Sequence, residues 1–212
     1  MIIAIDGPAA AGKGTIALKL AKHYGLNHLD TGLLYRAIGR LMTEQGLDVD
    51  NAAEAGAVAR KLRAKDLNHP DLRGREAGEL ASRVAVHPEV RAALVDFQRE
   101  FARMPPGAVL DGRDIGTVVC PDADVKLYVT ASAAVRAARR LRDIEGRGGT
   151  ADLSDILADI ERRDERDMGR ADSPLKPAAD AHLLDTSEMS IEAAFQAAKS
   201  IIDDRLAAGS TT

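Results

Sequence analysis

Short apolar runs alternate along the chain with longer segments in which apolar residues recur at helical spacing. The first run, Ile2–Ile5, is continuous, as expected for a strand that is buried on both faces of a parallel sheet. Similar runs follow at 108–110, 125–129 and 183–184. This alternation is typical of a doubly wound α/β fold, so the pattern predicts a central parallel sheet with helices on its faces.

Three segments of helical period are predicted to pack one face inward. The first begins at Gly14 and ends at Gly25, a residue type that suits a helix C-cap. The second spans 88–101, with Phe97 on its apolar face, and the third spans 190–206. We expect all three apolar faces to be buried.

Two further segments are predicted to lie apart from the sheet. Residues 49–83 are rich in alanine and charge, which predicts helices and loops. Gly146–Thr150 contains three glycines between two arginine-rich helices, which predicts a hinge or the tip of a lid. The small polar residues 209–212 predict a frayed end.

Composition excludes several classes of protein. The chain has 212 residues, of which 45% are hydrophobic and 29% are charged, as expected for one globular domain. Cys120 is the single cysteine, so neither a disulfide within the chain nor a cysteine zinc site is available. A net charge of −4, 3% aromatic residues and the absence of a long apolar run argue against a nucleic-acid polymer or a membrane as partner. We expect a cytoplasmic monomer.

The segment between the first predicted strand and the first predicted helix has the spacing of a phosphate-binding loop. Its residues are Gly7, Pro8, Ala9, Ala10, Ala11, Gly12, Lys13, Gly14 and Thr15. Such glycines let backbone N–H groups converge on phosphate oxygens, and the lysine reaches the β- and γ-phosphates. A turn that only caps the helix is the alternative, but it leaves both the spacing and the strand–turn–helix context to coincidence. We therefore predict that these residues bind ATP and that Lys13 is catalytic.

One position departs from the usual form of this loop. The hydroxyl residue that normally follows the lysine is replaced by Gly14, and Thr15 comes one place later. The usual direct hydroxyl ligand to Mg²⁺ is therefore missing. The form Gly-Lys-Gly-Thr is similar to the loop of nucleoside monophosphate kinases, and the chain lacks the Asn-Lys-x-Asp motif of GTPases.

Polar segments that follow the second and third predicted strands supply candidates for an acceptor site. Arg36 and Arg113 lie in these segments, and ligands of open parallel sheets collect at the carboxyl ends of the strands. A guanidinium binds phosphate with two parallel hydrogen bonds, so both arginines are candidates for holding an acceptor phosphate. Arg36 as a surface charge and residues 111–114 as a purely structural turn are the alternatives. Asp111 could orient magnesium-bound water, and spacing alone does not separate these roles.

A third candidate region is the predicted helix that runs from Leu153 to Arg170. Its stripe of apolar residues continues as charged residues, including Arg163 and Asp167, which indicates a helix that leaves the core and enters a wet cleft. Such residues could grip a sugar and a base. A solvated helix with surface ion pairs is the alternative, and the arginines of the preceding helix are equally ambiguous.

Several blocks occur in a fixed order along nearly the whole chain. They are Ile5–Pro8, Gly12–Thr15, Leu29–Gly32 with Tyr35 and Arg36, Asp111–Asp114 with Gly116–Val119, Arg163–Arg170 with Pro174 and Leu175, Asp180 with Ala181, and Leu184–Ser187. In this order they resemble the bacterial cytidylate kinase family. The resemblance implies transfer of the γ-phosphate of ATP to CMP or dCMP, giving CDP or dCDP and ADP, with Mg²⁺ accompanying ATP.

The same resemblance implies a three-layer α/β P-loop NTPase fold with a central parallel sheet, a mobile acceptor-binding region and an arginine-rich lid. The chain, 1–212, would form a single kinase domain. Its approximate parts would be a core at 1–31, 107–140 and 171–208, an acceptor-binding region at 32–106, and a lid at 141–170.

Roles for individual residues also follow from the resemblance. Thr31, Arg36 and Arg113 would hold the acceptor phosphate, Arg163 and Asp167 would contact the sugar, and Ser82, Arg91, Asp114 and Arg170 would read cytosine. Lys13, Arg113 and Arg163 would be the catalytic residues. The chemistry suits cytosine, whose amino group donates to a carboxylate while its carbonyl and ring nitrogen accept from arginine or serine.

One departure from the family concerns the acceptor region. Bacterial relatives commonly carry a β-rich insert there, whereas residues 66–81 are short, polar and poor in strand formers, so we expect no small antiparallel sheet. Other functions stay open at this point. They are a kinase for another small acceptor such as UMP, AMP or shikimate, a nucleotide-switched regulator or ATP hydrolase, and a nucleotide-binding module without activity.

Overall fold

The computed structural model describes residues 1–209 and contains one five-stranded parallel sheet. The strands are β1 (Ile2–Asp6), β2 (Asn27–Asp30), β3 (Ala108–Gly112), β4 (Val125–Thr130) and β5 (His182–Asp185). Their spatial order is β2-β3-β1-β4-β5, and every neighbouring pair is parallel. Because β1 is the central strand, the loop that follows it emerges at the middle of the carboxyl edge, where ligands of such sheets collect.

Helices connect and cover the strands. The α-helices are α1 (Lys13–Tyr24), α2 (Thr31–Glu44), α3 (Ala52–Ala59), α4 (Arg75–Val84), α5 (Pro88–Arg103), α6 (Ala133–Glu145), α7 (Leu153–Met168) and α8 (Ile191–Gly209). Two short 3₁₀ helices, η1 (Ala64–Asn68) and η2 (Pro70–Arg73), precede α4, and a π-helical turn, η3 (Ile115–Val119), follows β3.

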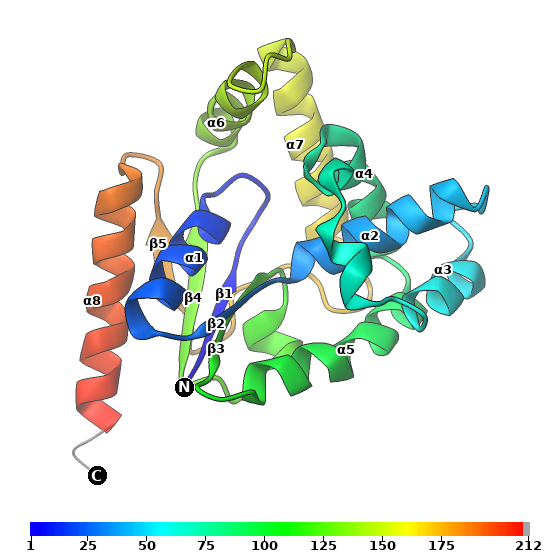
Figure 1. Ribbon diagram of the computed structural model, residues 1–212. Coiled ribbons are helices and arrows are strands. Elements are labelled where there is room, and N and C mark those ends of the chain that lie inside the picture. The colour runs from blue at the N-terminus through cyan, green and yellow to red at the C-terminus, as the bar shows by residue number, and fades with distance from the viewer. Residues whose placement is uncertain (210–212) are drawn as a thin grey trace.

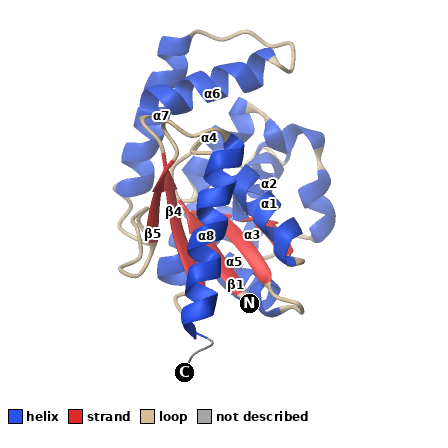
Figure 2. Cartoon of the chain, turned by 90° about the vertical axis from the view of Figure 1, so that its left-hand side faces the viewer, coloured by secondary structure: helices blue, strands red, loops and turns tan. Residues whose placement is uncertain are grey.

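The sheet lies between two helical layers. Helices α1 and α8 cover one face, where Figure 2 shows α8 lying across the strands. Helix α5 and η3 pack against the other face. Figure 1 shows α2 to α5 grouped on one side of the sheet, with α6 and α7 forming a hairpin that rises above its carboxyl edge. This is the expected three-layer α/β P-loop NTPase fold.

Apolar side chains collect in four clusters instead of one continuous core. Two clusters lie on the two faces of the sheet, around Ile5 and around Leu110. A third cluster, around Ile38, is formed mainly by α2, α3, α4 and α5, and a fourth, around Ile160, by α6 and α7. The helices of the expected acceptor region and lid therefore each have an apolar cluster of their own.

The secondary structure confirms most of the elements expected from the pattern. The four apolar runs are β1, β3, β4 and β5, and the three helical segments are α1, α5 and α8. Residues 49–83 form α3, η1, η2 and most of α4, and 66–81 contain no strand in the described chain. The end of the chain from residue 210 lies outside the described residues. Across residues 1–209, no helix combines the length and apolar character needed to cross a bilayer.

Three apolar positions differ from the expectation that they are buried. Phe97 in α5, Ile191 in α8 and Leu153 in α7 are exposed. Ile191 and Leu153 are the first residues of their helices, where the side chain projects beyond the end of the layer below. Phe97 lies on α5 between the buried turns at Leu94 and Gln98, so it sits at the margin of the packed face.

Candidate active site

The loop between β1 and α1 has a backbone that only small residues allow. Gly7 lies so close to β4 that a Cβ there would be 1.9 Å from the carbonyl oxygen of Val129. Gly12 is left-handed with φ of 89° and caps α1, and Ala10 also has a positive φ of 59°. Successive amides of this loop and the first turn of α1 form a concave N–H surface suited to phosphate.

Lys13 begins α1 and folds back over the loop. Its Nζ donates to the carbonyl oxygen of Pro8 at 3.3 Å. Burial, and next the positive charge of Arg113, lower the pKa of Lys13 to about 7, although Asp111 and Asp30 oppose this shift. The ammonium group is therefore held in a site where a further negative charge would stabilise it strongly.

Asp111 lies at the carboxyl end of β3, buried next to the phosphate-binding loop. Its Oδ2 is 2.9 Å from Nε2 of His28, and its backbone carbonyl accepts from Oγ1 of Thr31 at 2.8 Å. Its other carboxylate oxygen, Oδ1, would be 3.7 Å from a Cβ added at Gly14. A carboxylate oxygen therefore adjoins the place where the usual loop carries its hydroxyl side chain.

Three arginines gather on the acceptor side of this loop. Arg113 donates from Nε to Oδ2 of Asp167 at 2.9 Å, and Nε of Arg163 is 3.8 Å from the same oxygen. Arg36 pairs with Asp30 at 3.4 Å. Burial, and next Arg113, lower the pKa of Arg163 to about 10, with Arg36 contributing in the same direction. Although burial opposes it, Arg113 and Arg163 hold the pKa of Asp167 below its ordinary value. The region is thus positively charged and suited to an anion.

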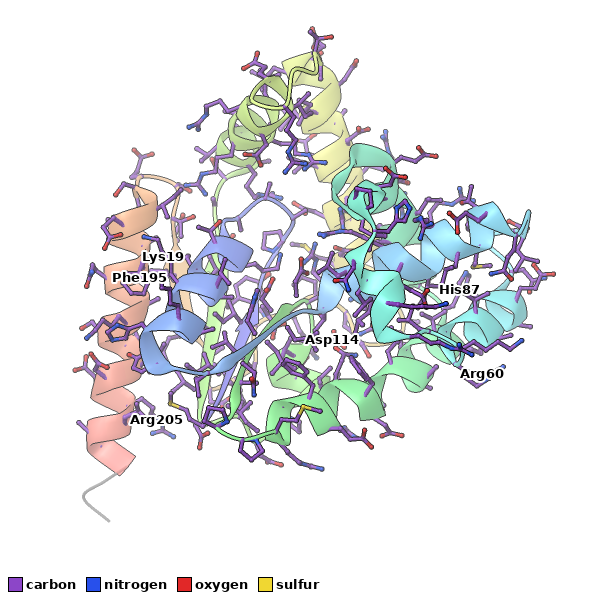
Figure 3. The ribbon with its side chains drawn as sticks, viewed as in Figure 1. Lys19, Arg60, His87, Asp114, Phe195 and Arg205 are labelled. Carbon is purple, nitrogen blue, oxygen red and sulfur yellow. The ribbon has the colours of Figure 1, made fainter. Side chains whose placement is uncertain are left out.

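Most of the expected cytosine readers come together next to this cluster. Arg91 is paired with Asp114 and also donates to the carbonyl oxygen of Ala85 at 3.3 Å. Its guanidinium lies 5.7 Å from the ring centroid of Tyr35. Figure 3 shows Asp114 near the middle of the molecule, between the sheet and the helices α2 to α5. A planar, polar pocket wall is therefore built from α2, α5 and the end of β3.

The other two expected cytosine readers are Ser82 and Arg170, of which Arg170 lies close to Arg91 and Asp114. The Oγ of Ser82 is buried and has no hydrogen-bond partner within residues 1–209. Arg170 is buried, donates to the carbonyl oxygen of Ser173 at 2.7 Å, and lies close enough to Arg91 for their charges to interact. It also lines a cavity of about 570 Å³ between the end of α7 and the α4–α5 connection. Ser82 Oγ and Arg170 Nε are thus buried donors without a partner among the described residues.

Two arginines of α6, Arg136 and Arg139, contact the phosphate-binding loop. Arg136 makes two hydrogen bonds to Asp164, at 3.1 and 2.5 Å, and donates to the carbonyl oxygen of Ala9 at 3.3 Å. Arg139 donates to both oxygens of Thr186, which in turn donates to the carbonyl oxygen of Ala11 at 3.1 Å. These bonds connect the α6–α7 hairpin and the segment after β5 to the loop.

Asp6, at the carboxyl end of β1, binds the turn that follows Asp114. Its carboxylate accepts from the backbone N–H groups of Ile115 and Gly116, both at 2.8 Å. Burial raises the pKa of Asp6 to about 7 despite these hydrogen bonds. These hydrogen bonds join the end of β1 to the turn that follows Asp114. They hold the backbone between the phosphate-binding loop and the expected cytosine-reading residues.

Comparison with known proteins identifies the family. A family model described as cytidylate kinase matches residues 3–203. The chain belongs to the cytidylate kinase family. Among curated cytidylate kinases, that of Mesorhizobium japonicum is 67% identical over 204 residues, covering 96% of this chain and 94% of the relative. That of Sinorhizobium medicae is 61% identical over 202 residues, covering 95% of each chain.

A solved structure supports the fold of this cytidylate kinase family member. An uncharacterized protein from Eubacterium ventriosum aligns with a TM-score of 0.57 at 16% identity, covering 96% of this chain and 98% of that one. At such low identity the likeness bears on the architecture alone.

The structure brings together residues that the sequence analysis named and some that it did not. Thr31 is hydrogen-bonded to Asp111, and Arg113 and Arg163 both lie against Asp167. Five partners had no role from sequence: His28, Tyr35, Asp6, Asp164 and Thr186. For His28 and Asp6 a signal existed, since both are polar residues at or near the end of a predicted strand in an open α/β sheet.

Proposed function

We propose that this chain is a nucleoside monophosphate kinase that transfers the γ-phosphate of ATP to CMP or dCMP, giving CDP or dCDP and ADP. One observation carries the proposal. A lysine-bearing phosphate-binding loop faces a cluster of arginines, and beyond this cluster lies the Arg91–Asp114 pair. In this proposal, the binding sites for a triphosphate, an acceptor phosphate and a polar base would follow one another along the carboxyl edge of the sheet.

Catalysis rests on positioning and charge neutralisation. Lys13 and the loop amides would hold the transferring phosphoryl group, while Thr31, Arg36 and Arg113 would hold the acceptor phosphate that otherwise repels it. Arg163 would contact the sugar together with Asp167 and add positive charge next to Arg113. The attacking oxygen of the acceptor phosphate is already anionic, so the reaction needs no dedicated general base. The same arginines therefore bring two anions together and stabilise the charge of the transition state.

The residues at the loop also fit a magnesium ion that arrives with ATP. Mg²⁺ prefers oxygen ligands, keeps several waters, and neutralises charge on the β- and γ-phosphates. Asp111 turns a buried carboxylate oxygen toward Gly14 and would hold such an ion through water. This oxygen would serve where the hydroxyl ligand of the usual loop is missing.

Recognition of cytosine would depend on the second group of residues. Asp114 accepts hydrogen bonds, which matches the amino group of cytosine, and Ser82, Arg91 and Arg170 offer donors to its ring nitrogen and carbonyl. Uracil presents a carbonyl where cytosine has the amino group. The oxygen of Asp114 that the amino group of cytosine would occupy then faces a carbonyl and lacks a donor, and this discriminates strongly between the two bases.

Two parts of the chain are proposed to close over the substrates. The acceptor-binding region, approximately 32–106, and the lid, approximately 141–170, have apolar clusters separate from those of the sheet, which supports movement of each as a unit. Closure would bring Arg136 and Arg139 closer to the phosphates and exclude water.

The test is ADP release with magnesium and ATP against CMP, dCMP, UMP, AMP, GMP, shikimate and no acceptor, with identification of each product. We expect turnover mainly with CMP and dCMP, and a Lys13→Ala variant that folds but is slower by orders of magnitude. Preference for another acceptor would keep a kinase but refute the cytosine assignment. ADP release without any acceptor would mean a hydrolase, and ATP binding without turnover would mean a binding module.

A further inference from the structure

His28 lies on the edge strand β2, on the same face of the sheet as Asp111. In the parallel pairing, His28 is opposite Val109 and Asp30 is opposite Asp111, so the imidazole lies diagonally across from the Asp111 side chain. Its Nε2 is 2.9 Å from Oδ2 of Asp111. The His28 side chain is 21% exposed and that of Asp111 is 4% exposed. The imidazole therefore shields the carboxylate at the margin of the sheet.

The direction of this hydrogen bond follows from the chemistry of the pair. A carboxylate has only acceptor oxygens, so the ring nitrogen of His28 donates and carries the proton. The two carboxylate oxygens of Asp111 therefore have different surroundings. Oδ2 is held by His28, and Oδ1 faces Gly14 at the start of α1.

A carboxylate needs such a partner if it is to hold one orientation. The χ2 torsion of aspartate has a broad, roughly two-fold profile, so rotation about it costs little by itself. The bond from Thr31 fixes the backbone of Asp111, because it goes to the carbonyl oxygen and leaves the side chain free to turn. Within residues 1–209, the hydrogen bond from His28 is the one that holds this carboxylate, and it opposes rotation of Oδ1 away from the loop.

We propose that His28 is a positioning residue that locks Oδ1 of Asp111 toward the phosphate-binding loop, where this carboxylate holds magnesium through water. The inference rests on the proposed function and adds to it. His28 touches neither nucleotide, and it acts through Asp111 alone. It compensates for Gly14, because a loop without its own hydroxyl ligand depends on the orientation of an external carboxylate.

The test compares His28→Leu with His28→Gln, whose amide N–H reaches the position of Nε2 and preserves the donor. His182→Leu is the matched control, since it makes the same change on β5, the other edge strand. For each variant, calorimetry measures the affinity for the β,γ-imido analogue of ATP with magnesium and with EDTA. The ratio of the two affinities isolates the contribution of the metal.

We expect His28→Leu to reduce this ratio about 10-fold, as loss of an outer-shell hydrogen bond does at metal sites, with the affinity in EDTA unchanged. His28→Gln should recover most of the ratio. The turnover number should fall with the ratio, while the KM for CMP stays constant. In an Asp111→Asn background, His28→Leu should have no further effect on the ratio, because the carboxylate that His28 positions is absent.

Other results would overturn the inference. A ratio for His28→Leu within twofold of that for His182→Leu would show that the histidine does not position the carboxylate. An equal loss in the Asp111→Asn background would show a general structural role. Circular dichroism and the melting temperature check the fold of each variant. If His28→Leu does not fold, the ratio measured for His28→Gln decides: a ratio close to that of the wild-type chain supports the inference, and a ratio reduced about 10-fold contradicts it. CMP turnover by the wild-type chain reports separately on the proposed function.

Discussion

The lowered pKa of Lys13 predicts that ATP binding is coupled to proton uptake. Burial and the nearby Arg113 hold this pKa at about 7 in the ligand-free protein. A bound triphosphate places several negative charges beside Nζ, which returns the pKa to its ordinary range near about 10.4. Above pH 7, Lys13 is therefore mostly neutral in the ligand-free protein and charged in the ATP complex. Binding of ATP thus takes up a proton.

The magnitude follows from the two pKa values. At pH 8 a group with a pKa of about 7 is only about 10% protonated, so binding should take up about 0.9 proton per ATP. The affinity should fall as the pH rises, by about 50-fold between pH 7 and pH 9, because each bound ATP must first recover this proton. With magnesium bound, the terminal phosphate of ATP is ionised over this range and contributes little.

Calorimetry in buffers of different ionisation enthalpy measures the proton directly. The slope of the observed enthalpy against the buffer enthalpy should be about 0.9 at pH 8. Lys13→Arg is the matched control, because arginine stays charged throughout and should show a slope near zero and a flat affinity. A slope near zero for the wild-type chain, or equal slopes for both proteins, would refute the reasoning.

Three further predictions concern stability and the lid. Asp167→Asn should lower the free energy of unfolding in urea by about 3 kcal/mol, since it removes the buried carboxylate that pairs with the partly buried Arg113 and Arg163; a loss under about 1 kcal/mol would contradict this. Gly7→Ala should abolish folding or lower the melting temperature by well over 10 °C, because its Cβ would overlap the Val129 carbonyl, whereas Gly25→Ala, with open space around it, should cost only about 1 kcal/mol. Arg136→Lys keeps the charge but loses the paired hydrogen bonds to Asp164, so amide hydrogen exchange in α6 and α7 should become faster while exchange in α8 does not change.

The fold could be predicted because its signals are local. A strand buried on both faces needs a continuous apolar run, and Ile2–Ile5 displays one directly in the sequence; Val125–Val129 displays one that only Lys126 interrupts. The phosphate-binding loop is similarly local, since its spacing and its position between strand and helix are adjacent in the chain. The limits of local pattern appear at Phe97, whose helical spacing matches its buried neighbours although the helix below leaves it uncovered.

The pairing within the site could not be predicted, because it depends on tertiary geometry. Arg113 and Asp167 are 54 positions apart, and Arg136 and Asp164 come from two different helices, so no spacing connects them. The sequence offers many arginines and aspartates of similar appearance around 136–170, and only packing decides which carboxylate faces which guanidinium. His28 illustrates the same limit, because its role depends on the register between β2 and β3.

The salt bridges of the ligand-free site have a consequence for selectivity among anions. Arg36, Arg91, Arg113 and Arg136 each already have an aspartate partner within the chain. An incoming anion must therefore displace a tethered carboxylate, whose effective concentration exceeds that of any free ion in solution. A lone inorganic phosphate or sulfate replaces one such partner at little net gain. A nucleotide engages several guanidiniums at once and so gains more than it displaces. The site therefore binds abundant simple anions weakly and binds molecules that carry a phosphate, a sugar and a base together more tightly.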